Sequence, residues 1–127
     1  MKKIKRHGLG LLLFLGLLFI AQTGFADKTG VSISAPEAAA KGSEVSVKLT
    51  ITHSGNNMFH YTDWVYLKVN QKEVARWNFA SDNRPEEATF VREVKIKVPE
   101  PLELTAEGHC NLHGSKGPAN WKIKIKE

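Results

Sequence analysis

The stretch Glu44-Val45-Ser46-Val47-Lys48-Leu49-Thr50-Ile51 decides the fold class of this chain, because polar and apolar residues alternate along it without a break. Successive side chains of an extended strand point to opposite faces, so the alternation places all four apolar side chains on one face. A strand of this kind covers a core with one face and meets water with the other, which is typical of an antiparallel sheet.

Six further stretches show strand-like patterning and are separated by short polar or proline-containing connections. They span residues 31–34, 61–69, 73–79, 88–98, 102–108 and 121–126. Segment 37–42 is instead rich in alanine, and we expect a brief helical turn there. About seven short strands at near-regular spacing, without a long helical pattern, predict an all-β fold, an immunoglobulin-like antiparallel β-sandwich.

The first 26 residues have the composition of a secretory signal peptide. Four basic residues precede an apolar run at 9–20, and the small residues Gly24 and Ala26 come just before Asp27. This order is typical of a signal peptide, and the run is shorter than the roughly 20 apolar residues of a membrane-spanning helix. We therefore expect a signal peptide at 1–26 and one domain at 27–127, exported to a periplasm. Membrane attachment is expected only if the signal segment stays uncleaved.

The charge of the predicted domain argues against nucleic acid as a partner. The whole chain carries 18 Lys and Arg against 13 Asp and Glu, a formal charge of +5. Four of the basic residues and none of the acidic ones lie in 1–26, so the domain keeps 18 − 4 = 14 basic residues against 13 acidic ones, a charge of +1. A nucleic-acid-binding domain needs a clustered basic face, which this balance does not provide.

A single cysteine, Cys110, lies in the stretch His109-Cys110-Asn111-Leu112-His113-Gly114. Exported domains commonly pair their cysteines in disulfides, which a lone cysteine cannot do within one chain. Cys110 and His113 lie three residues apart on a predicted turn, and His53 and His60 flank a polar loop upstream. Three imidazoles and one thiolate suit zinc, iron or copper rather than calcium or magnesium. We therefore predict one metal ion bound by His53, His60, Cys110 and His113.

Nearby residues are predicted to have other roles. His109 adjoins Cys110, and adjacent strand side chains point to opposite faces, so we do not expect His109 on the same metal. Met58 and the tryptophans Trp64, Trp77 and Trp121 are expected to be packing residues. An iron–sulfur cluster is excluded, because it normally needs four cysteines. Two functions stay open from the residues alone: non-catalytic binding of zinc or copper, and cupredoxin-like electron transfer, although the usual methionine after the second histidine is missing.

The motif Cys-Asn-x-His-Gly at 110–114 resembles the C-terminal iron motif of superoxide reductases, the neelaredoxin and desulfoferrodoxin iron domain. The upstream segment resembles that family's His-Pro-Met-x-x-x-His-Tyr-Ile-x-Trp pattern. Here His53 and Met58 precede His60-Tyr61-Thr62-Asp63-Trp64, and the two histidines are one residue further apart than in the family. The similarity runs from about residue 27 to residue 126 and so covers the whole predicted domain.

The resemblance implies the same immunoglobulin-like sandwich and a mononuclear iron that cycles between Fe2+ and Fe3+. It implies His53, His60 and His113 as equatorial ligands and Cys110 as the axial thiolate, with an open position that meets superoxide. Superoxide would be reduced to hydrogen peroxide, and an external electron donor protein would reduce the iron again. The resemblance also implies that Trp64 lies beside the metal pocket.

One departure from the family pattern removes an expected ligand. The family takes a fourth equatorial histidine from an early Glu-Lys-His-Val-Pro motif, and alignment on Ala35-Pro36-Glu37 places Thr29 at that histidine. The same alignment makes Lys28 the counterpart of the lysine that attracts superoxide, which is the one catalytic role assigned here. We expect four protein ligands, with water or the α-amino group of Asp27 in the gap.

Overall fold

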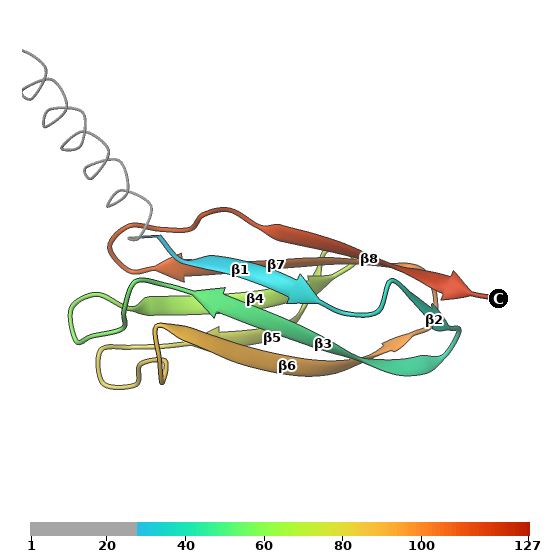
Figure 1. Cartoon of the computed structure of the whole chain (residues 1–127), viewed down its shortest axis with the longest axis horizontal. Helices are drawn as coiled ribbons and strands as arrows, with labels where there is room; N and C mark the ends of the chain where they lie inside the picture. The colour runs from blue at the N-terminus through green and yellow to red at the C-terminus, as the bar shows by residue number, and fades with distance from the viewer. Residues whose placement is uncertain (1–27) are drawn as a thin grey trace, which may run out of the picture.

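Two β-sheets packed face to face form the part of the chain that this computed structural model describes, residues 28–127 (Figure 1). One sheet has the strand order β1-β3-β6 and the other the order β2-β8-β7-β4-β5. The predicted immunoglobulin-like β-sandwich is confirmed, while the predicted signal peptide at 1–26 lies outside the described residues. From residue 28 onward, no helix has the length and apolar character to cross a membrane. The strands are β1 (Gly30–Ser34), β2 (Ala38–Ala40), β3 (Ser43–Thr52), β4 (Thr62–Val69), β5 (Lys72–Asn78), β6 (Thr89–Val98), β7 (Leu102–Cys110) and β8 (Ala119–Lys126).

The alanine-rich segment forms the short strand β2, so the expected helical turn is wrong. β2 pairs with β8 in parallel, whereas the other pairs of named strands are antiparallel. Three alanines are too few to nucleate a helix in isolation, and β8 offers backbone partners at once. The backbone N–H of Lys124 donates to the carbonyl of Glu37 at 2.9 Å, and Ala39 is buried against the core.

The alternating stretch that predicts the fold lies in β3, and its apolar side chains face the core. Val47, Leu49 and Ile51 are fully buried, whereas Val45 near the strand start is only partly buried. Burying one such side chain stabilises the fold by about 1.5–3 kcal/mol. Both sheets contribute to the cluster, whose other buried members are Ala39, Val65, Leu67, Phe90, Val98, Leu102, Leu104, Ala106 and Ile123.

The sandwich brings both histidine-bearing segments to one end (Figure 1). β3 runs into this end, and the 53–61 connection leads from it back into β4. β7 ends there too, and the backbone N–H of Asn111 donates to the carbonyl of Tyr61 at 3.0 Å. Two segments far apart in sequence therefore lie side by side, and we call this the metal end.

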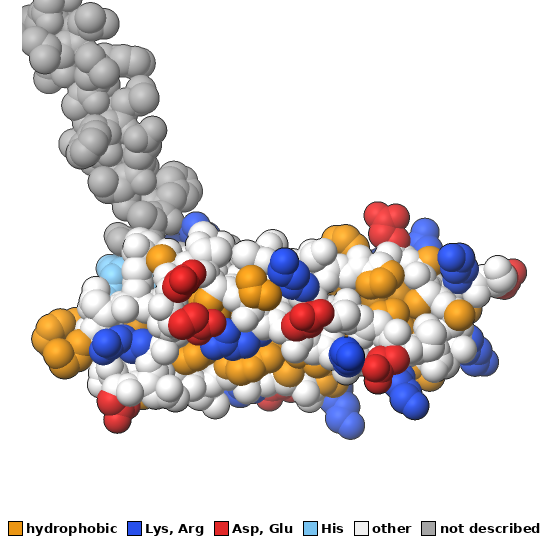
Figure 2. Space-filling model, turned by 60° about the horizontal axis from the view of Figure 1, so that its bottom comes forward, with side chains coloured by type: hydrophobic (Ala, Val, Ile, Leu, Met, Phe, Trp, Pro, Cys, Tyr) orange, Lys and Arg blue, Asp and Glu red, His pale blue; other side chains and the backbone are white. Residues whose placement is uncertain are grey.

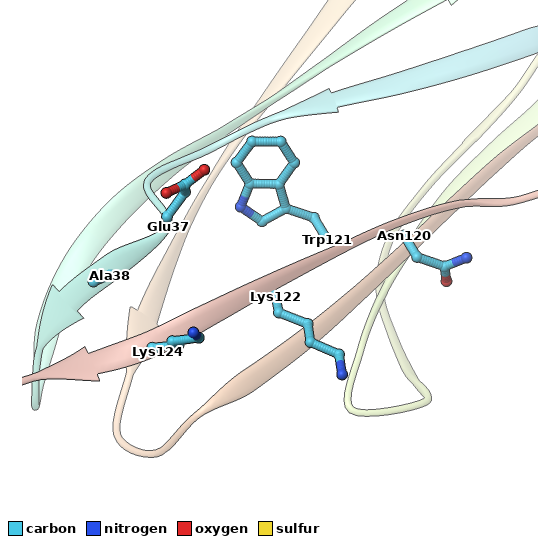
Figure 3. Close-up of a pocket in the computed structure, with 6 residues that line it drawn as sticks. All are labelled: Glu37, Ala38, Asn120, Trp121, Lys122 and Lys124. Carbon is cyan, nitrogen blue, oxygen red and sulfur yellow. The ribbon is translucent and has the colours of Figure 1, made fainter.

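A surface pocket of about 520 Å³ lies at the opposite end, beside β2 and β8 (Figure 3). Trp121 lines it, and the indole Nε1 of Trp121 donates to the carbonyl of Pro36 at 3.1 Å. Trp77 and Trp121 pack against the core, which confirms the predicted packing role of both. The pocket is lined by none of the predicted metal ligands.

Aromatic side chains form a stack on the outer face of the five-stranded sheet. The ring centroids of Trp64 and His109 lie 4.9 Å apart, and the ring planes are inclined by 7°. The ring centroids of Trp64 and Tyr66 lie 5.6 Å apart, with 13° between the planes. The guanidinium of Arg76 lies 5.3 Å from the Trp64 ring. The Tyr66 hydroxyl donates to a carboxylate oxygen of Glu107 at 2.8 Å. We call His109, Trp64 and Tyr66 the outer stack.

The phenol of Tyr66 is expected to ionise later than a free tyrosine. Burial, followed by the hydrogen bond to the Glu107 carboxylate and its negative charge, raises the pKa of Tyr66 to about 12. The unfolded chain releases this proton near pH 10. The contribution of Tyr66 to stability is therefore complete below about pH 10 and is lost as the pH rises toward 12. Absorbance of tyrosinate in the folded protein should show a transition near pH 12.

The chain has two tyrosines, which makes the assignment direct. Tyr66→Phe should remove the transition near pH 12, and Tyr61→Phe should keep it. Circular dichroism at each pH reports whether the chain is still folded. If Tyr66→Phe leaves the late transition in place, the hydrogen bond to Glu107 does not hold in solution.

Candidate metal centre

The four predicted ligands come from three strand ends. His53 follows the last residue of β3, and His60 stands two residues before β4. Cys110 is the last residue of β7, and His113 lies in the turn that follows. Both sheets of the sandwich therefore contribute, and a rigid scaffold fixes where each side chain begins.

The ligand atoms of His53, His60 and Cys110 lie together, and Nδ1 of His113 lies next to two of them. Nε2 of His60 lies 3.2 Å from Nε2 of His53 and 3.1 Å from Nδ1 of His113. Sγ of Cys110 lies 3.9 Å from Nδ1 of His113, and the ligand atoms of His53, His60 and Cys110 lie within 4.8 Å of one another. Two nitrogens each about 2.1 Å from a metal are about 3.0 Å apart at a right angle and about 3.4 Å apart in a tetrahedron. The donor set and its spacing therefore fit one first-row transition metal ion.

A hydrogen-bond network fixes which nitrogen of His53 faces the other ligand atoms. The amide of Asn56 is oriented by two partners, because its Nδ2 donates to the carbonyl of Glu87 at 2.8 Å and its Oδ1 accepts from the N–H of Thr62 at 2.7 Å. The same Oδ1 lies 3.2 Å from Nδ1 of His53, so Nδ1 carries the proton. The lone pair on Nε2 of His53 is then directed toward His60, as metal binding requires.

Asn111 joins the cysteine turn to the histidine loop. Its Oδ1 accepts from the N–H of Tyr61 at 3.0 Å, and its Nδ2 donates to the carbonyl of Phe59 at 3.1 Å. On the loop itself, Oδ1 of Asn57 accepts from the N–H of His60 at 2.9 Å. Sequence reasoning missed these asparagines as positioning residues. The one sequence signal was the position of Asn111 within the Cys-Asn-x-His-Gly motif, which indicated a role for its side chain.

A closed turn aims Cys110 and His113. The backbone of Cys110 exchanges two hydrogen bonds with that of Gly114, at 2.9 and 3.0 Å. Gly114 closes the turn with φ = +86°, a conformation that favours glycine, so the turn predicted for Cys110 and His113 is confirmed. Cys110 is fully buried and His113 is exposed. The cluster therefore has a sheltered thiol on one side and meets solvent on the side of His113.

Two lysines lie beside the cluster. The N–H of Thr29 donates to the carbonyl of Gly114 at 3.2 Å, and the N–H of Lys116 donates to the carbonyl of Thr29 at 2.9 Å. This pairing brings Lys28 and Lys116 to the same shallow pocket as His53. Both lysines are exposed. Two ammonium groups at one mouth raise the local concentration of small anions.

His109 and Trp64 belong to the outer stack rather than to the ligand cluster. A β-bulge between Thr62 and Trp64 sets both Asp63 and Trp64 against His109. Nδ1 of His109 pairs with Oδ1 of Asp63 at 2.7 Å, and its ring stacks on Trp64. His109 is thus directed away from Cys110, as predicted. Trp64 is not among the residues packed against the core, unlike Trp77 and Trp121. Although the resemblance places it beside the metal pocket, its described ring contacts are with His109, Tyr66 and Arg76.

Thr29, which replaces the expected histidine, is fully buried. Its Oγ1 lies 2.9 Å from Oγ1 of Thr62, which is also fully buried. Thr62 stands opposite Cys110 in the pairing of β4 with β7, so both side chains lie on the same face of the sheet. The position offers a hydroxyl held by another hydroxyl instead of an imidazole.

Removing one of these two hydroxyls is expected to cost more than removing both. Thr29→Val leaves the buried hydroxyl of Thr62 without its partner, which should lower the free energy of unfolding by about 1–3 kcal/mol. Thr29→Val combined with Thr62→Val should be close to neutral, because valine keeps the shape of threonine and no polar atom is left unpaired. Urea unfolding of the two single variants and the double variant measures the coupling. Strictly additive losses would show that the pair does not form.

Large apolar side chains are exposed at the metal end. Met58, Phe59 and Leu112 are 57%, 76% and 61% exposed, and we call them the apolar rim. Figure 2 shows hydrophobic side chains gathered at one end of the molecule, near a histidine. Met58 is therefore not the packing residue that the sequence predicts. Exposed apolar groups that lie together mark surfaces where other molecules bind.

Comparison with known proteins bears on the family and the fold of the chain. The sequence model of the desulfoferrodoxin family matches residues 23–117. The chain is similar in structure to the superoxide reductase (neelaredoxin) from Ignicoccus hospitalis, with 23% identity, 84% of this chain and 86% of that chain covered, and a TM-score of 0.67. It is also similar to a mutant superoxide reductase (neelaredoxin) from Archaeoglobus fulgidus in the reduced form, with 24% identity, 76% and 91% covered, and a TM-score of 0.55.

The fold alone does not determine function. A CARDB domain from Pyrococcus furiosus in complex with di-metal ions also matches, with 12% identity, 80% of this chain and 96% of that chain covered, and a TM-score of 0.60. None of the curated protein sequences compared with the chain matches it. The convergence of imidazoles and thiol, rather than the sandwich, therefore carries the chemical argument.

Proposed function

Because the chain belongs to the desulfoferrodoxin family, we propose that it is an exported mononuclear iron protein that reduces superoxide to hydrogen peroxide. The observation that carries the proposal is the group formed by His53, His60 and Cys110, whose ligand atoms lie within 4.8 Å of one another, with Nδ1 of His113 beside those of His60 and Cys110. In the reaction, superoxide takes up one electron and two protons. A ferrous ion bound at the cluster would supply that electron.

The residues of the cluster have separate tasks in this proposal. The imidazoles of His53, His60 and His113 hold the ion with neutral nitrogens, and the Cys110 thiolate gives it one negative charge. A ferrous ion with one thiolate keeps a net positive charge, which attracts an anionic substrate. Asn56 fixes the tautomer of His53 through its hydrogen bond at 3.2 Å. The exposed side of His113 provides the route from solvent.

Lys28 and Lys116 add to the attraction. They line one pocket with His53. No acidic residue is among the described residues that line this pocket. Superoxide is small and singly charged, so two ammonium groups steer it without needing a shaped binding site. In the proposal Lys28 has the catalytic role that the resemblance assigns to it, and Lys116 supports it.

The proposed cycle needs an electron donor. The chain has one cysteine and so cannot hold an iron–sulfur centre of its own. An external donor protein must then reduce the site after each turnover. The apolar rim of Met58, Phe59 and Leu112 lies next to the cluster, where such a partner would come closest to the metal.

The decisive experiment is a rapid-mixing measurement with superoxide. The iron-loaded, reduced protein should be oxidised by superoxide in a stoichiometric step, with one hydrogen peroxide formed per iron. A thiolate-to-ferric absorption band should appear at the same rate. Lys28→Gln should slow the step and weaken its dependence on ionic strength. Lys72→Gln should not, because this exposed lysine begins β5 and pairs with Val69 at the end of β4 away from the cluster. Ferrous protein that superoxide leaves unoxidised would contradict the proposal.

A second candidate is non-catalytic binding of zinc or copper. The observation that favours it is Thr29, because three imidazoles and one thiolate complete a four-coordinate zinc site without an open position. Thr29 replaces a histidine of the family pattern and Thr62 replaces an isoleucine. The two replacements are hydrogen-bonded to each other, so the second stabilises the first. Metal analysis of protein purified without added metal separates the candidates, since bound zinc supports this one and bound iron supports the reductase.

A further inference from the structure

The outer stack begins next to the predicted thiolate ligand. His109 adjoins Cys110 in β7, with its ring on the outer face of the sheet. The ring of Trp64 lies 4.9 Å from that of His109, and the ring of Tyr66 lies 5.6 Å from that of Trp64. Near-parallel rings at these separations are in contact. An unbroken series of aromatic side chains therefore leads from the peptide that carries Cys110 to the middle of the sheet.

The far end of the series is equipped to release a proton. The Tyr66 hydroxyl donates to a carboxylate oxygen of Glu107 at 2.8 Å. A phenol that loses an electron becomes a strong acid, and Glu107 is already in place to accept its proton. Burial and Glu107 raise the pKa of Tyr66, so the proton stays on the phenol until the electron has left.

Neighbouring cations determine which aromatic ring of the series is more easily oxidised. The guanidinium of Arg76 lies 5.3 Å from the Trp64 ring, and the ammonium of Lys68 lies 4.7 Å from the Tyr66 ring. A neutral ring attracts such a cation, whereas a ring that has lost an electron repels it. An oxidised Trp64 is thus disfavoured while it stays charged. An oxidised Tyr66 becomes neutral once Glu107 has taken its proton, so the oxidation is driven from Trp64 to Tyr66.

We propose that Trp64 and Tyr66 form a relay that delivers an electron to the metal site after that site reacts with hydrogen peroxide, and so spares Cys110. This inference rests on the proposed function, whose product is that peroxide. Reduction of one hydrogen peroxide to two waters consumes two electrons and two protons. The protons come from solvent, and one electron comes from the ferrous site. The second electron comes from Tyr66 by way of Trp64, while the phenolic proton passes to Glu107.

The alternative source of the second electron is the thiolate itself. Cys110 is the only cysteine of the chain, so oxidation to a sulfenic acid cannot be resolved by a disulfide within it. Further oxidation to a sulfinic or sulfonic acid is irreversible and would destroy the ligand. A relay that ends in a tyrosyl radical keeps the damage off the metal site, and external reductants can repair that radical.

Pulse radiolysis of the metal-free full chain tests the relay without any metal chemistry. An azide radical removes one electron from an indole and leaves as azide, and the indole proton goes to water. In the unaltered protein the indolyl absorption should decay as the tyrosyl absorption rises, at a rate independent of protein concentration. Trp64 then regains a proton as Tyr66 passes its own to Glu107.

Matched variants assign the radiolysis signal. Tyr66→Phe should lose the fast tyrosyl rise, and Tyr61→Phe should retain it. Trp64→Phe should also lose it, whereas Trp121→Phe, at the opposite end of the sandwich, should not. Glu107→Gln keeps a hydrogen-bond acceptor but not the carboxylate base, so the rise should be slower. A rise of unchanged rate in Tyr66→Phe would overturn the relay.

Treatment of the iron-loaded full chain with hydrogen peroxide tests the protective role. Mass spectrometry follows oxidation of Cys110, which should be several-fold faster in Tyr66→Phe and Trp64→Phe than in the unaltered protein or in Trp121→Phe. Equal rates in all four proteins would overturn the protective role. The two proposals fail separately: a chain that superoxide does not oxidise contradicts the proposed function, whereas the radiolysis result on metal-free protein still decides the relay.

Discussion

Iron-loaded Cys110→Ser is expected to lose its thiolate-to-ferric absorption band and to bind metal about 100-fold or more weakly. Cys110 is the only cysteine, and its Sγ is fully buried within 4.8 Å of the ligand atoms of His53 and His60. A serine hydroxyl at the same place does not ionise near neutral pH and cannot replace the charge of a thiolate. Visible absorbance after oxidation, together with the metal retained after dialysis, measures both effects.

Ala106→Ser is the matched control for Cys110→Ser. Ala106 lies in the same strand and is also fully buried, so its replacement adds a buried hydroxyl without touching the cluster. This variant should be somewhat less stable but should keep the absorption band. If Cys110→Ser keeps the band as well, the thiolate does not bind the metal and the proposed function loses its thiolate ligand.

The strands that the sequence predicts are those whose alternation is visible locally. β3 is the clearest case, because Val47, Leu49 and Ile51 repeat at the period of a strand and all three are buried. β2 carries no such signal, since three alanines do not alternate. Its partner β8 lies more than 80 residues further along the chain. Pairing of that kind depends on the assembled sandwich, so local propensity alone predicted a helical turn there.

In the candidate site, too, the sequence predicted some features and not others. Residue type and spacing predicted which side chains could share a metal, and the exclusion of His109 followed from the alternation of a strand. The hydrogen bonds that hold the ligands could not be predicted, because Asn56 is oriented by Glu87, 31 residues away, and Asn111 bonds to Tyr61, 50 residues away. The meeting of Thr29 with Thr62 spans 33 residues. Sequence identifies the change at Thr29, and only the fold shows that Thr62 compensates for its buried hydroxyl.

Ile51→Ala is expected to lower the free energy of unfolding by about 2–5 kcal/mol. Ile51 is fully buried, and its neighbours in the sheet are Phe90 of β6 and Val31 of β1. Truncation removes buried methyl groups and leaves a cavity that both sheets must tolerate. Because small domains are stable by only about 5–15 kcal/mol, this is a large share of the total. Urea unfolding of the metal-free chain measures the loss.

Val91→Ala is the control for Ile51→Ala, because Val91 lies in β6 beside Phe90 but is 42% exposed. It should change the free energy of unfolding by much less, since surface substitutions usually stay within about 0.5 kcal/mol. Ile51 also stands two residues before His53, so metal that binds only the folded chain should restore part of the lost stability of Ile51→Ala. Equal losses in both variants would contradict the assignment of the core. A metal-independent midpoint would contradict the link between this core and the site.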